Sequence, residues 1–520
     1  MATQPSEESP LLGPSEGGKH DDGDAKPRFP LSFAARVTIG VASLALMFSV
    51  EIADSLLGVA RTQVVESIVC RKRFPDVALG SSDPRCKDDR VQSELSMLQA
   101  TEVSCALLPG LLAAVPWGVV ADRRGRIFVL RLTMLGLVLY EGANTIICRF
   151  PEVFPIQLVW VTPVFMLIGG GVSMASAMIY AVVNDISSEA QRATMFFYIA
   201  AAAILADLLS KPITYVAMES GIWFAIYTGY ACLVICLASL LFLPALIIRL
   251  GNIHYAPVEA VPVEEPCVKD GPMAAMRKSV SSGLEQVMGS FRVLFYDNKK
   301  LGLILLSIMF TMLGKVASIV LLQYITKRFG WSWSQANMLL SVRSVAQLGL
   351  ILVILPALAQ FLLVKVRLAP LAKDVWMARG SIIVLILGAF VIGLAASPAW
   401  LVVSLVLFAL GSGFSASAKS LLAAVAKGHD VGMLYTTVSF VEMSGLLIAS
   451  PLLAASFRIG MELGGGWVGL PFIAAGGLFT LAALIIMGMS FSDAGKKAYF
   501  SPSHCDINPD EEDESRWSHQ

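Results

Sequence analysis

The most informative deficiency of this sequence is its shortage of charge. Only 15% of its 520 residues are Asp, Glu, Lys or Arg, whereas 56% are hydrophobic, and the mean hydropathy is +0.70. A soluble domain of this size needs a much larger polar surface. Positive and negative charges balance to a net charge of zero, so the composition indicates neither nucleic acid nor any other strongly charged partner.

Residue types that serve metal and nucleotide chemistry are also scarce. The eight cysteines and five histidines are scattered, without a CxxC pair or a Cys/His cluster, so we expect no metal site and no cofactor. The sequence has no Walker motif, and ATP is therefore not expected to drive the protein. Because no nucleophile–base pair stands out either, an enzyme is the least favoured class.

What the sequence has in abundance is hydrophobic runs of roughly twenty residues, the length of a helix that crosses about 30 Å of hydrocarbon. Six runs precede a polar stretch near the middle of the chain, and six follow it. We therefore predict an all-α membrane protein with about twelve transmembrane helices in two six-helix bundles. The runs lie at 33–60, 98–120, 127–148, 156–183, 193–217, 222–248, 301–325, 336–364, 380–396, 400–426, 434–457 and 467–491.

Five regions follow from these runs. A polar tail, 1–32, precedes the first bundle, 33–248. A linker, 249–300, leads to the second bundle, 301–491, and an acidic tail, 492–520, ends the chain. The tails are rich in Pro, Gly, Asp and Glu, a composition typical of disordered segments.

The distribution of Lys and Arg in short loops predicts the orientation in the membrane. With the N-terminus in the cytoplasm, the short inner loops hold twelve of these residues and the short outer loops hold four. The loop after the first run carries many bases, but acids match them nearly one for one, so we interpret it as an internally paired cap. It also holds Cys70 and Cys86, which would face an oxidising space and either pair or remain unrelated thiols.

A charged motif, GVVADRRGR, stands between the second and third runs at residues 118–126. It resembles the signature of the major facilitator superfamily: a Gly, an Asp four residues later, a basic residue and then Gly-Arg. The residue types suit such a turn. Gly118 lets two helices approach closely, Asp122 ends a helix, Gly125 permits a tight turn, and Arg126 opens the next helix.

The resemblance implies a role for this turn. In the superfamily the aspartate lies near the start of the eleventh helix, where backbone N–H groups favour an anion, and the arginine meets an acid at the inner end of the fourth helix. Asp185 takes that place here. Gly118, Asp122, Gly125, Arg126 and Asp185 are then a latch that shuts the cytoplasmic side in the outward-open state; the alternative is an ordinary charged turn.

Further segments, including ESIVCRKRF and EAQRATMFFYIAAA, resemble a fungal branch of the superfamily that is distantly similar to proton-coupled folate transporters. This resemblance implies a monomeric transporter of the plasma membrane, which exports a small organic secondary metabolite or toxin in exchange for protons. The vacuolar membrane is an alternative, because Glu7 and Leu11–Leu12 resemble a dileucine sorting signal.

Two departures from the superfamily pattern bear on direction and coupling. Met166 replaces an arginine that many members carry four residues before a glycine, here Gly170, and the antiporter signature is missing from the fifth run. Proton-coupled uptake of an organic acid or vitamin-like nutrient, or a non-transporting receptor, therefore stay open as alternatives.

Ionisable residues are unusually common inside the predicted spans, although each costs about 2.5 to 3.5 kcal/mol at a helix centre on insertion scales. In the first span, Glu51, Asp54, Gly58 and Arg61 follow helical spacing and lie on one face. Two carboxylates this close repel each other, which favours uptake of a proton. Glu51 and Asp54 are therefore the leading proton-coupling candidates; the alternative is that the helix ends early and leaves them among the outer headgroups.

The other candidates are spread over both predicted bundles. Asp207 and Lys211 lie one turn apart in the fifth span and can pair with each other, and Glu442 lies beside small residues in the eleventh. Asp207 and Glu442 are further proton-coupling candidates, although each could equally serve in a structural ion pair. The substrate-cavity candidates are Lys211, Lys315, Arg343, Lys419 and Glu141. The bases among them suit a substrate with a carboxylate or an acidic hydroxyl.

Overall fold

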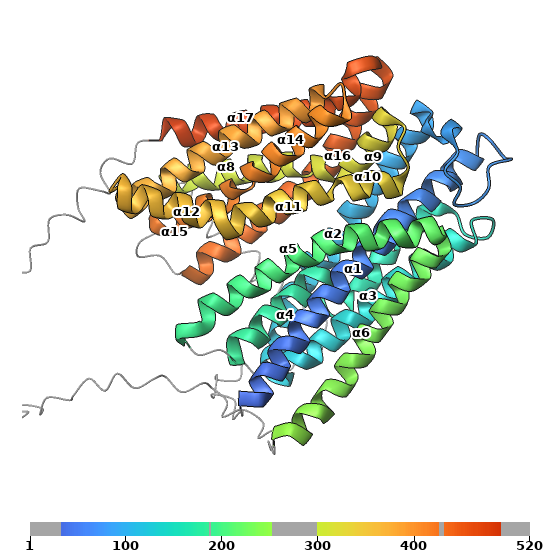
Figure 1. The fold of residues 1–520 in the computed structure, drawn as a ribbon. Coiled ribbons are helices and arrows are strands. Elements are labelled where there is room, and N and C mark those ends of the chain that lie inside the picture. Colours follow the sequence, from blue (N-terminus) through green and yellow to red (C-terminus); the bar gives the residue numbers. More distant parts are fainter. Residues whose placement is uncertain (1–32, 187–188, 252–298, 426–430, 490–520) are drawn as a thin grey trace, which may run out of the picture.

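The computed structural model describes residues 33–186, 189–251, 299–425 and 431–489 (Figure 1). These ranges are helical and contain no strand. Eleven of their helical segments are long and apolar enough to cross a membrane. The second predicted run is not among the eleven; it forms part of a 36-residue helix in the same bundle. The all-α membrane architecture is confirmed, and most of the predicted linker and tails lie outside the described residues.

The first group of helices holds six α-helices and three short 3-10 turns. The α-helices are α1 (Phe33–Arg71), α2 (Asp89–Arg124), α3 (Arg126–Arg149), α4 (Gly171–Ile186), α5 (Glu189–Ser220) and α6 (Ile222–Gly251). The turns are η1 (Pro84–Lys87), η2 (Ile156–Trp160) and η3 (Thr162–Leu167).

Two predicted runs of this group have different limits in the structure. The first run continues to Arg71 rather than stopping near residue 60, because Val64, Val65 and Val69 add a buried stripe to its last turns. The run at 156–183 is not one α-helix: its first part forms η2 and η3, and three consecutive glycines at 169–171 have positive φ before α4 begins.

The second group of helices is more interrupted. Its α-helices are α8 (Lys299–Lys315), α9 (Ala317–Phe329), α10 (Trp333–Leu339), α11 (Ser341–Gly349), α12 (Leu355–Gln360), α13 (Pro370–Leu394), α14 (Pro398–Gly411), α15 (Gly413–Val425), α16 (Val431–Leu463) and α17 (Leu470–Gly488). The π-helical turns η5 (Leu350–Ile354) and η6 (Phe361–Lys365) flank α12, and the 3-10 turn η7 (Gly465–Gly469) precedes α17. α13 begins ten residues before the predicted run 380–396, since Pro370 is well suited to a first helical turn.

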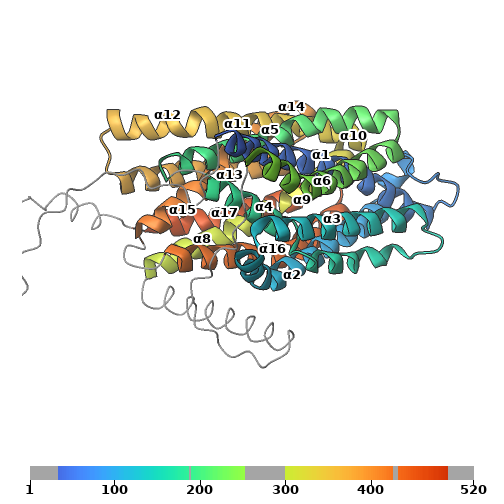
Figure 2. The same ribbon diagram turned by 90° about the horizontal axis from the view of Figure 1, so that it is seen from below.

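The two groups of helices form two bundles side by side. We call the end that carries Cys70 and Cys86 the disulfide end, and the end at which α6 stops and α8 starts the linker end. The bundles lie together at the disulfide end and diverge toward the linker end (Figure 1). Seen from below, their helices run roughly along one direction, with α5 beside α11 (Figure 2).

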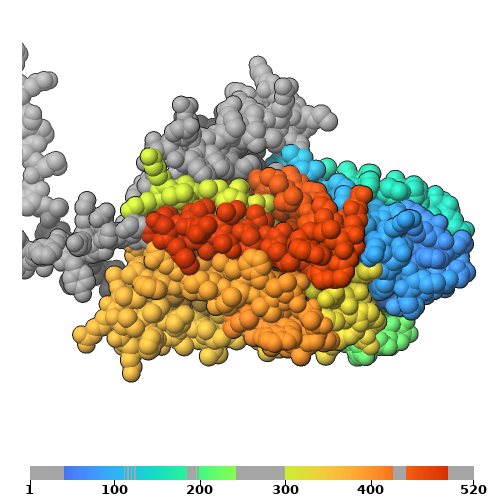
Figure 3. All heavy atoms as spheres, turned by 90° about the horizontal axis from the view of Figure 1, so that it is seen from above, coloured from blue at the N-terminus to red at the C-terminus, as the bar shows by residue number. Residues whose placement is uncertain are grey.

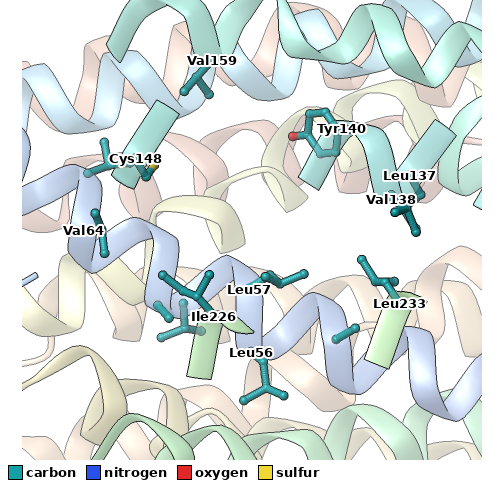
Figure 4. Packing of buried hydrophobic residues seen from close by; sticks show 14 of the residues in the cluster. Leu56, Leu57, Val64, Leu137, Val138, Tyr140, Cys148, Val159, Ile226 and Leu233 are labelled. Carbon is teal, nitrogen blue, oxygen red and sulfur yellow. The ribbon is translucent and has the colours of Figure 1, made fainter. Parts of the chain in front are cut away.

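The core of the first bundle forms where α1 packs against its neighbours. Ala53, Leu56, Ala60 and Val64 are fully buried, and their spacing places them on one stripe of α1. Leu56 and Leu57 lie among side chains of α3 and α6, including Ile226 (Figure 4). Because this apolar stripe faces the bundle, the charged stripe of α1 is turned toward a different neighbour.

The second bundle depends on close backbone contacts between α13 and α14. A Cβ at Gly388 would lie 2.5 Å from the Phe408 nitrogen, and a Cβ at Gly411 would lie 2.5 Å from the Leu385 Cα. Small residues permit such helix crossings in membranes. The helices can therefore approach this closely only with glycine at both positions.

We expect Gly388→Ala to destabilise the protein by about 1–3 kcal/mol, the usual cost of overpacking. The matched control is Gly380→Ala in the same helix, where a Cβ would meet nothing within 4 Å. Thermal melting of the two purified variants in detergent checks this difference. Equal melting temperatures for both variants would contradict the close crossing.

Candidate functional site

A cavity of about 410 Å³ lies where the two bundles meet. The first bundle contributes the charged stripe of α1, including Asp54 and Arg61, together with residues of α2 and α3. The second bundle contributes Gln323 of α9 and Trp333 of α10. The walls are otherwise mostly aliphatic, so the site combines an apolar lining with a few polar groups, as small-molecule sites commonly do.

Arg61 is the centre of the polar side of this cavity. Its guanidinium lies 2.8 Å from the Glu141 carboxylate and 3.3 Å from the Glu102 carboxylate. The Tyr140 hydroxyl donates a hydrogen bond of 2.8 Å to Glu102, and the guanidinium lies 5.8 Å from the centre of the Tyr140 ring. One cation is thus held by two carboxylates from α2 and α3, so its charge is fully compensated.

Asp54 faces the same cavity without a partner of this kind. It is exposed to the cavity, and within the described ranges no hydrogen bond or ion pair joins it to another side chain. Glu51, one turn earlier on α1, is half-buried and is likewise unpaired in the described ranges. Both residues lie well inside α1, so the alternative that the helix ends before them is wrong.

Asp207 and Lys211 form a second polar cluster between the bundles. Their side chains pair at 2.6 Å on α5, and the Ser344 hydroxyl of α11 donates a hydrogen bond of 2.5 Å to the other Asp207 oxygen. Arg343 lies close enough to Asp207 to interact with its charge. Asp207 therefore connects the two bundles directly, and Lys211 is neutralised within its own helix.

The charges of the second bundle meet around Glu442. Lys419 of α15 pairs with Glu442 of α16 at 2.8 Å, and Lys315 lies within electrostatic reach of Glu442, Lys419 and Arg343. Within the described ranges, neither Lys315 nor Arg343 takes part in an ion pair. Four bases were predicted for the substrate cavity. Lys211 and Lys419 each pair with a carboxylate, whereas no carboxylate in the described ranges neutralises Lys315 or Arg343 directly.

The predicted latch is only partly described. Gly125 has φ +94° and separates α2 from α3, as the tight turn requires. Arg126 donates a hydrogen bond to the backbone carbonyl of Ala181 on α4, one turn before Asp185. A Cβ at Gly118 would meet nothing within 4 Å, so the close helix approach predicted there is not observed. The Asp122 and Asp185 side chains lie outside the described part of the structure.

The loop at the disulfide end is internally paired. Cys70 and Cys86 form a disulfide. Arg85 pairs with Asp76 and Asp83 at 2.8 Å each, and the hydrogen bonds from its guanidinium hold the pKa of both carboxyls below their usual value. The loop is therefore a cross-linked cap with matched charges.

Fungal efflux pumps are similar in sequence to this chain over most of its length. The MFS efflux pump atnC of Emericella nidulans is 27% identical over 503 residues, which cover 94% of each chain. The efflux pump ustT of Aspergillus flavus is 30% identical over 454 residues, or 85% of this chain and 86% of that protein.

The chain belongs to the major facilitator superfamily. It is accordingly a multi-pass membrane transporter and not an enzyme. No known family model matches it.

Solved structures of superfamily transporters share the fold. A D-xylose–proton symporter superposes with a TM-score of 0.56 at 14% identity, over 89% of this chain and 99% of that one. The human organic anion transporter MFSD10 gives a TM-score of 0.52 at 16% identity, over 86% and 99%. At this level of identity the similarity shows the architecture alone.

Several polar residues of the cavity were not predicted from the sequence. Gln99, Tyr140, Gln323 and Trp333 line the cavity, yet none is unusual in a hydrophobic run. The sequence interpretation counts Glu66 among the acids of the loop after the first run, but the structure places it in the last turns of α1, where an acid needs a partner. Its partner in the second bundle, Trp333, is 267 residues away in the sequence, so no local sequence pattern could have identified it.

We expect Arg61→Ala to lower the stability of the transporter by about 3–5 kcal/mol, because it leaves two buried carboxylates without their counter-charge. The measurement is thermal melting in detergent. The control is Arg458→Ala: Arg458 pairs with Glu462 at 3.0 Å, but both side chains are about 60% exposed, so its loss should cost under about 1 kcal/mol. Comparable losses in the two variants would show that the Arg61 cluster is not a buried charge network.

Proposed function

We propose that the protein exports a small organic secondary metabolite or toxin in exchange for protons, by alternating access of the central cavity. The observation that carries the proposal is an unpaired carboxylate, Asp54, in a cavity between two bundles; the other charged side chains that line this cavity, Arg61 and Glu102, pair with each other. The named relatives that are efflux pumps support export rather than uptake. Rocking of two bundles about a midplane site is the mechanism that such an architecture permits.

The proposed orientation places the linker end in the cytoplasm and the disulfide end outside. The excess of Lys and Arg in the short loops of the linker end supports it. The disulfide between Cys70 and Cys86 supports it as well, because disulfides persist in oxidising compartments. In this orientation the structure is closed toward the outside, and the bundles diverge toward the cytoplasm.

Asp54 and Glu51 are the proposed proton carriers. An isolated carboxylate is costly in a medium of low dielectric constant, and either a proton or a cation relieves that cost. Around Asp54, the only guanidinium of the cavity lining, Arg61, is already engaged by Glu102 and Glu141. A proton is therefore the simplest way to neutralise Asp54, and its release to the cytoplasm would reset the site.

Lys315 and Arg343 are the proposed contacts for an acidic group of the substrate. Lys211 and Lys419 are each paired at 2.8 Å or less, so they are less available than the sequence suggested. The two unpaired cations lie on α8 and α11 of the second bundle, and not among the residues that line the 410 Å³ cavity. A substrate that contacts both bundles would then be bound more tightly in one state than in the other, as transport requires.

The proposed latch belongs to the opposite state. Arg126 already reaches α4 at Ala181, close in sequence to Asp185. When the bundles close at the linker end, Asp122 and Arg126 would hold that end shut. The latch and the cap would then act at opposite ends of the molecule.

Export is tested by untargeted mass spectrometry of medium and cell extracts, with the wild-type protein, with Asp54→Asn, and without the protein. We expect at least one compound to accumulate inside cells that lack the protein. Asp54→Asn should cause most of the same accumulation, because an amide cannot carry a proton.

The control is Asp76→Asn, which changes an exposed carboxylate of the cap and should export normally. Membrane levels of each variant are compared by immunoblot. Normal export by Asp54→Asn would remove Asp54 as the proton carrier. Depletion of the compound inside cells that lack the protein would mean uptake and would overturn the proposed direction.

A further inference from the structure

Toward the disulfide end, the cavity ends at side chains that belong to another polar cluster, which is centred on Glu66. Trp333 and Gln323 line the cavity, but their side-chain N–H groups point to partners in the first bundle. The Trp333 indole nitrogen donates a hydrogen bond of 2.6 Å to Glu66. The Gln323 amide nitrogen lies 2.7 Å from the Gln92 backbone oxygen and 2.9 Å from its side-chain oxygen.

Glu66 is the centre of this cluster. It is 1% exposed, and it accepts hydrogen bonds from three groups. Lys87 and Gln92, at 2.7 and 2.5 Å, belong to its own bundle; Trp333 belongs to the other. The Lys87 ammonium group also lies 4.8 Å from the centre of the Trp333 ring.

Three further contacts bridge the bundles around this cluster. Lys327 of α9 pairs with Asp89 at 2.7 Å and also donates a hydrogen bond to the Lys87 backbone oxygen. The Ser334 hydroxyl donates a hydrogen bond of 2.9 Å to Glu219. At this end the segment that contains the cap lies directly against segments of the second bundle (Figure 3). All of these contacts must break if the bundles separate at the disulfide end.

We propose that Glu66, Gln92, Gln323 and Trp333 form the outer gate of the transport path, and that the disulfide-linked cap lets this gate open without exposing a bare carboxylate. The proposal rests on the alternating-access function above, and it assigns specific residues to closure at the disulfide end.

The cap explains how the gate can open. Cys86 is fully buried and disulfide-bonded to the last turn of α1, which fixes the neighbouring Lys87 beside Glu66. The Cys86 carbonyl also accepts a hydrogen bond of 2.9 Å from Gln92. When Trp333 moves away with its bundle, Glu66 keeps both partners of its own bundle. Opening therefore breaks one hydrogen bond to Glu66 and leaves its charge compensated, whereas an isolated buried carboxylate would be far more costly.

Trp333 also connects the gate to the cavity. Its side chain forms part of the cavity wall and also donates the hydrogen bond to Glu66 in the gate. A ligand that displaces the indole must weaken the gate, because the nitrogen cannot shift without losing Glu66. Trp333 and Gln323 are therefore positioning residues, which act on access to the site through Glu66 and Gln92.

The gate is tested by cysteine accessibility, which needs no substrate. Val103 lines the cavity, and Val103→Cys serves as the reporter in the full-length protein in cells. A membrane-impermeant maleimide is added from the disulfide side, and labelling of the same protein without the reporter is subtracted. Trp333→Phe keeps a ring but removes the donor to Glu66, so we expect labelling to rise about tenfold, the effect of losing one hydrogen bond to a charged group.

The matched control is Trp331→Phe. Trp331 lies two residues away, and its ring contacts Phe329 of its own bundle at 6.3 Å between centres; its variant should label like the wild type. If Trp333→Phe does not reach the membrane, Gln323→Leu removes the hydrogen bonds to Gln92 and should also raise labelling. Equal labelling of gate and control variants overturns the proposal.

The side of labelling separates a gate from general loosening. In inside-out vesicles the same reagent reaches the linker side, and labelling of Val103→Cys there should not rise in Trp333→Phe. A rise from both sides would mean that the variant merely destabilises the fold, and it would overturn the gate. Failure of export with a normal gate response would instead count against the proposed function alone.

Discussion

Most buried ion pairs in these apolar helices exist because an isolated charge in hydrocarbon costs several kcal/mol. The pair between Arg61 and Glu141, 2.8 Å apart, shows how the constraint shapes the first bundle. α1 buries its apolar stripe against α5 and α6. Its charged stripe faces α2, α3 and the second bundle, and Glu51 and Asp54 also lie within electrostatic reach of Asp207 and Lys211 on α5. The cavity lies where that charged stripe meets the second bundle. The groups in it that can bind a proton or a ligand are those without an ion-pair partner, such as Asp54.

The unpaired groups are divided between the two bundles. Asp54 and Glu51 lie on the first, and Lys315 and Arg343 lie on the second. Paired groups such as Lys419 and Glu442 stabilise one bundle internally, whereas Asp207 reaches across to Ser344. A proton or a substrate that compensates an unpaired group changes the cost of separating or joining the bundles. In the proposed mechanism, binding and conformation would be coupled for this reason.

The sequence predicts the architecture well because hydrophobic run length and helical spacing are local properties. The shared face of Glu51, Asp54 and Arg61 is an example, since spacing along one helix is enough to place them. Run length did not predict the 3-10 turns between residues 156 and 167, because glycine φ angles and packing decide that break.

Contacts between residues far apart in the chain could not be predicted from the sequence. Glu141 is 80 residues from Arg61, and Trp333 is 267 residues from Glu66. The charged residues stand out in or beside hydrophobic runs, but no local pattern identifies these partners. Only the packing of α1 against α2, α3 and α10 shows that Glu141 pairs with the cavity-lining Arg61 and that Glu66 bonds across the bundles to Trp333.

Proton exchange is the central claim of this account, and proton flux in proteoliposomes tests it most directly. The purified protein is reconstituted with a pH-sensitive dye, and the compound identified by mass spectrometry is placed on one side without a pH gradient. The account predicts that protons move against the direction of the compound, and that Asp54→Asn abolishes this movement. Protons that move together with the compound, or no proton movement during its transport, would contradict it.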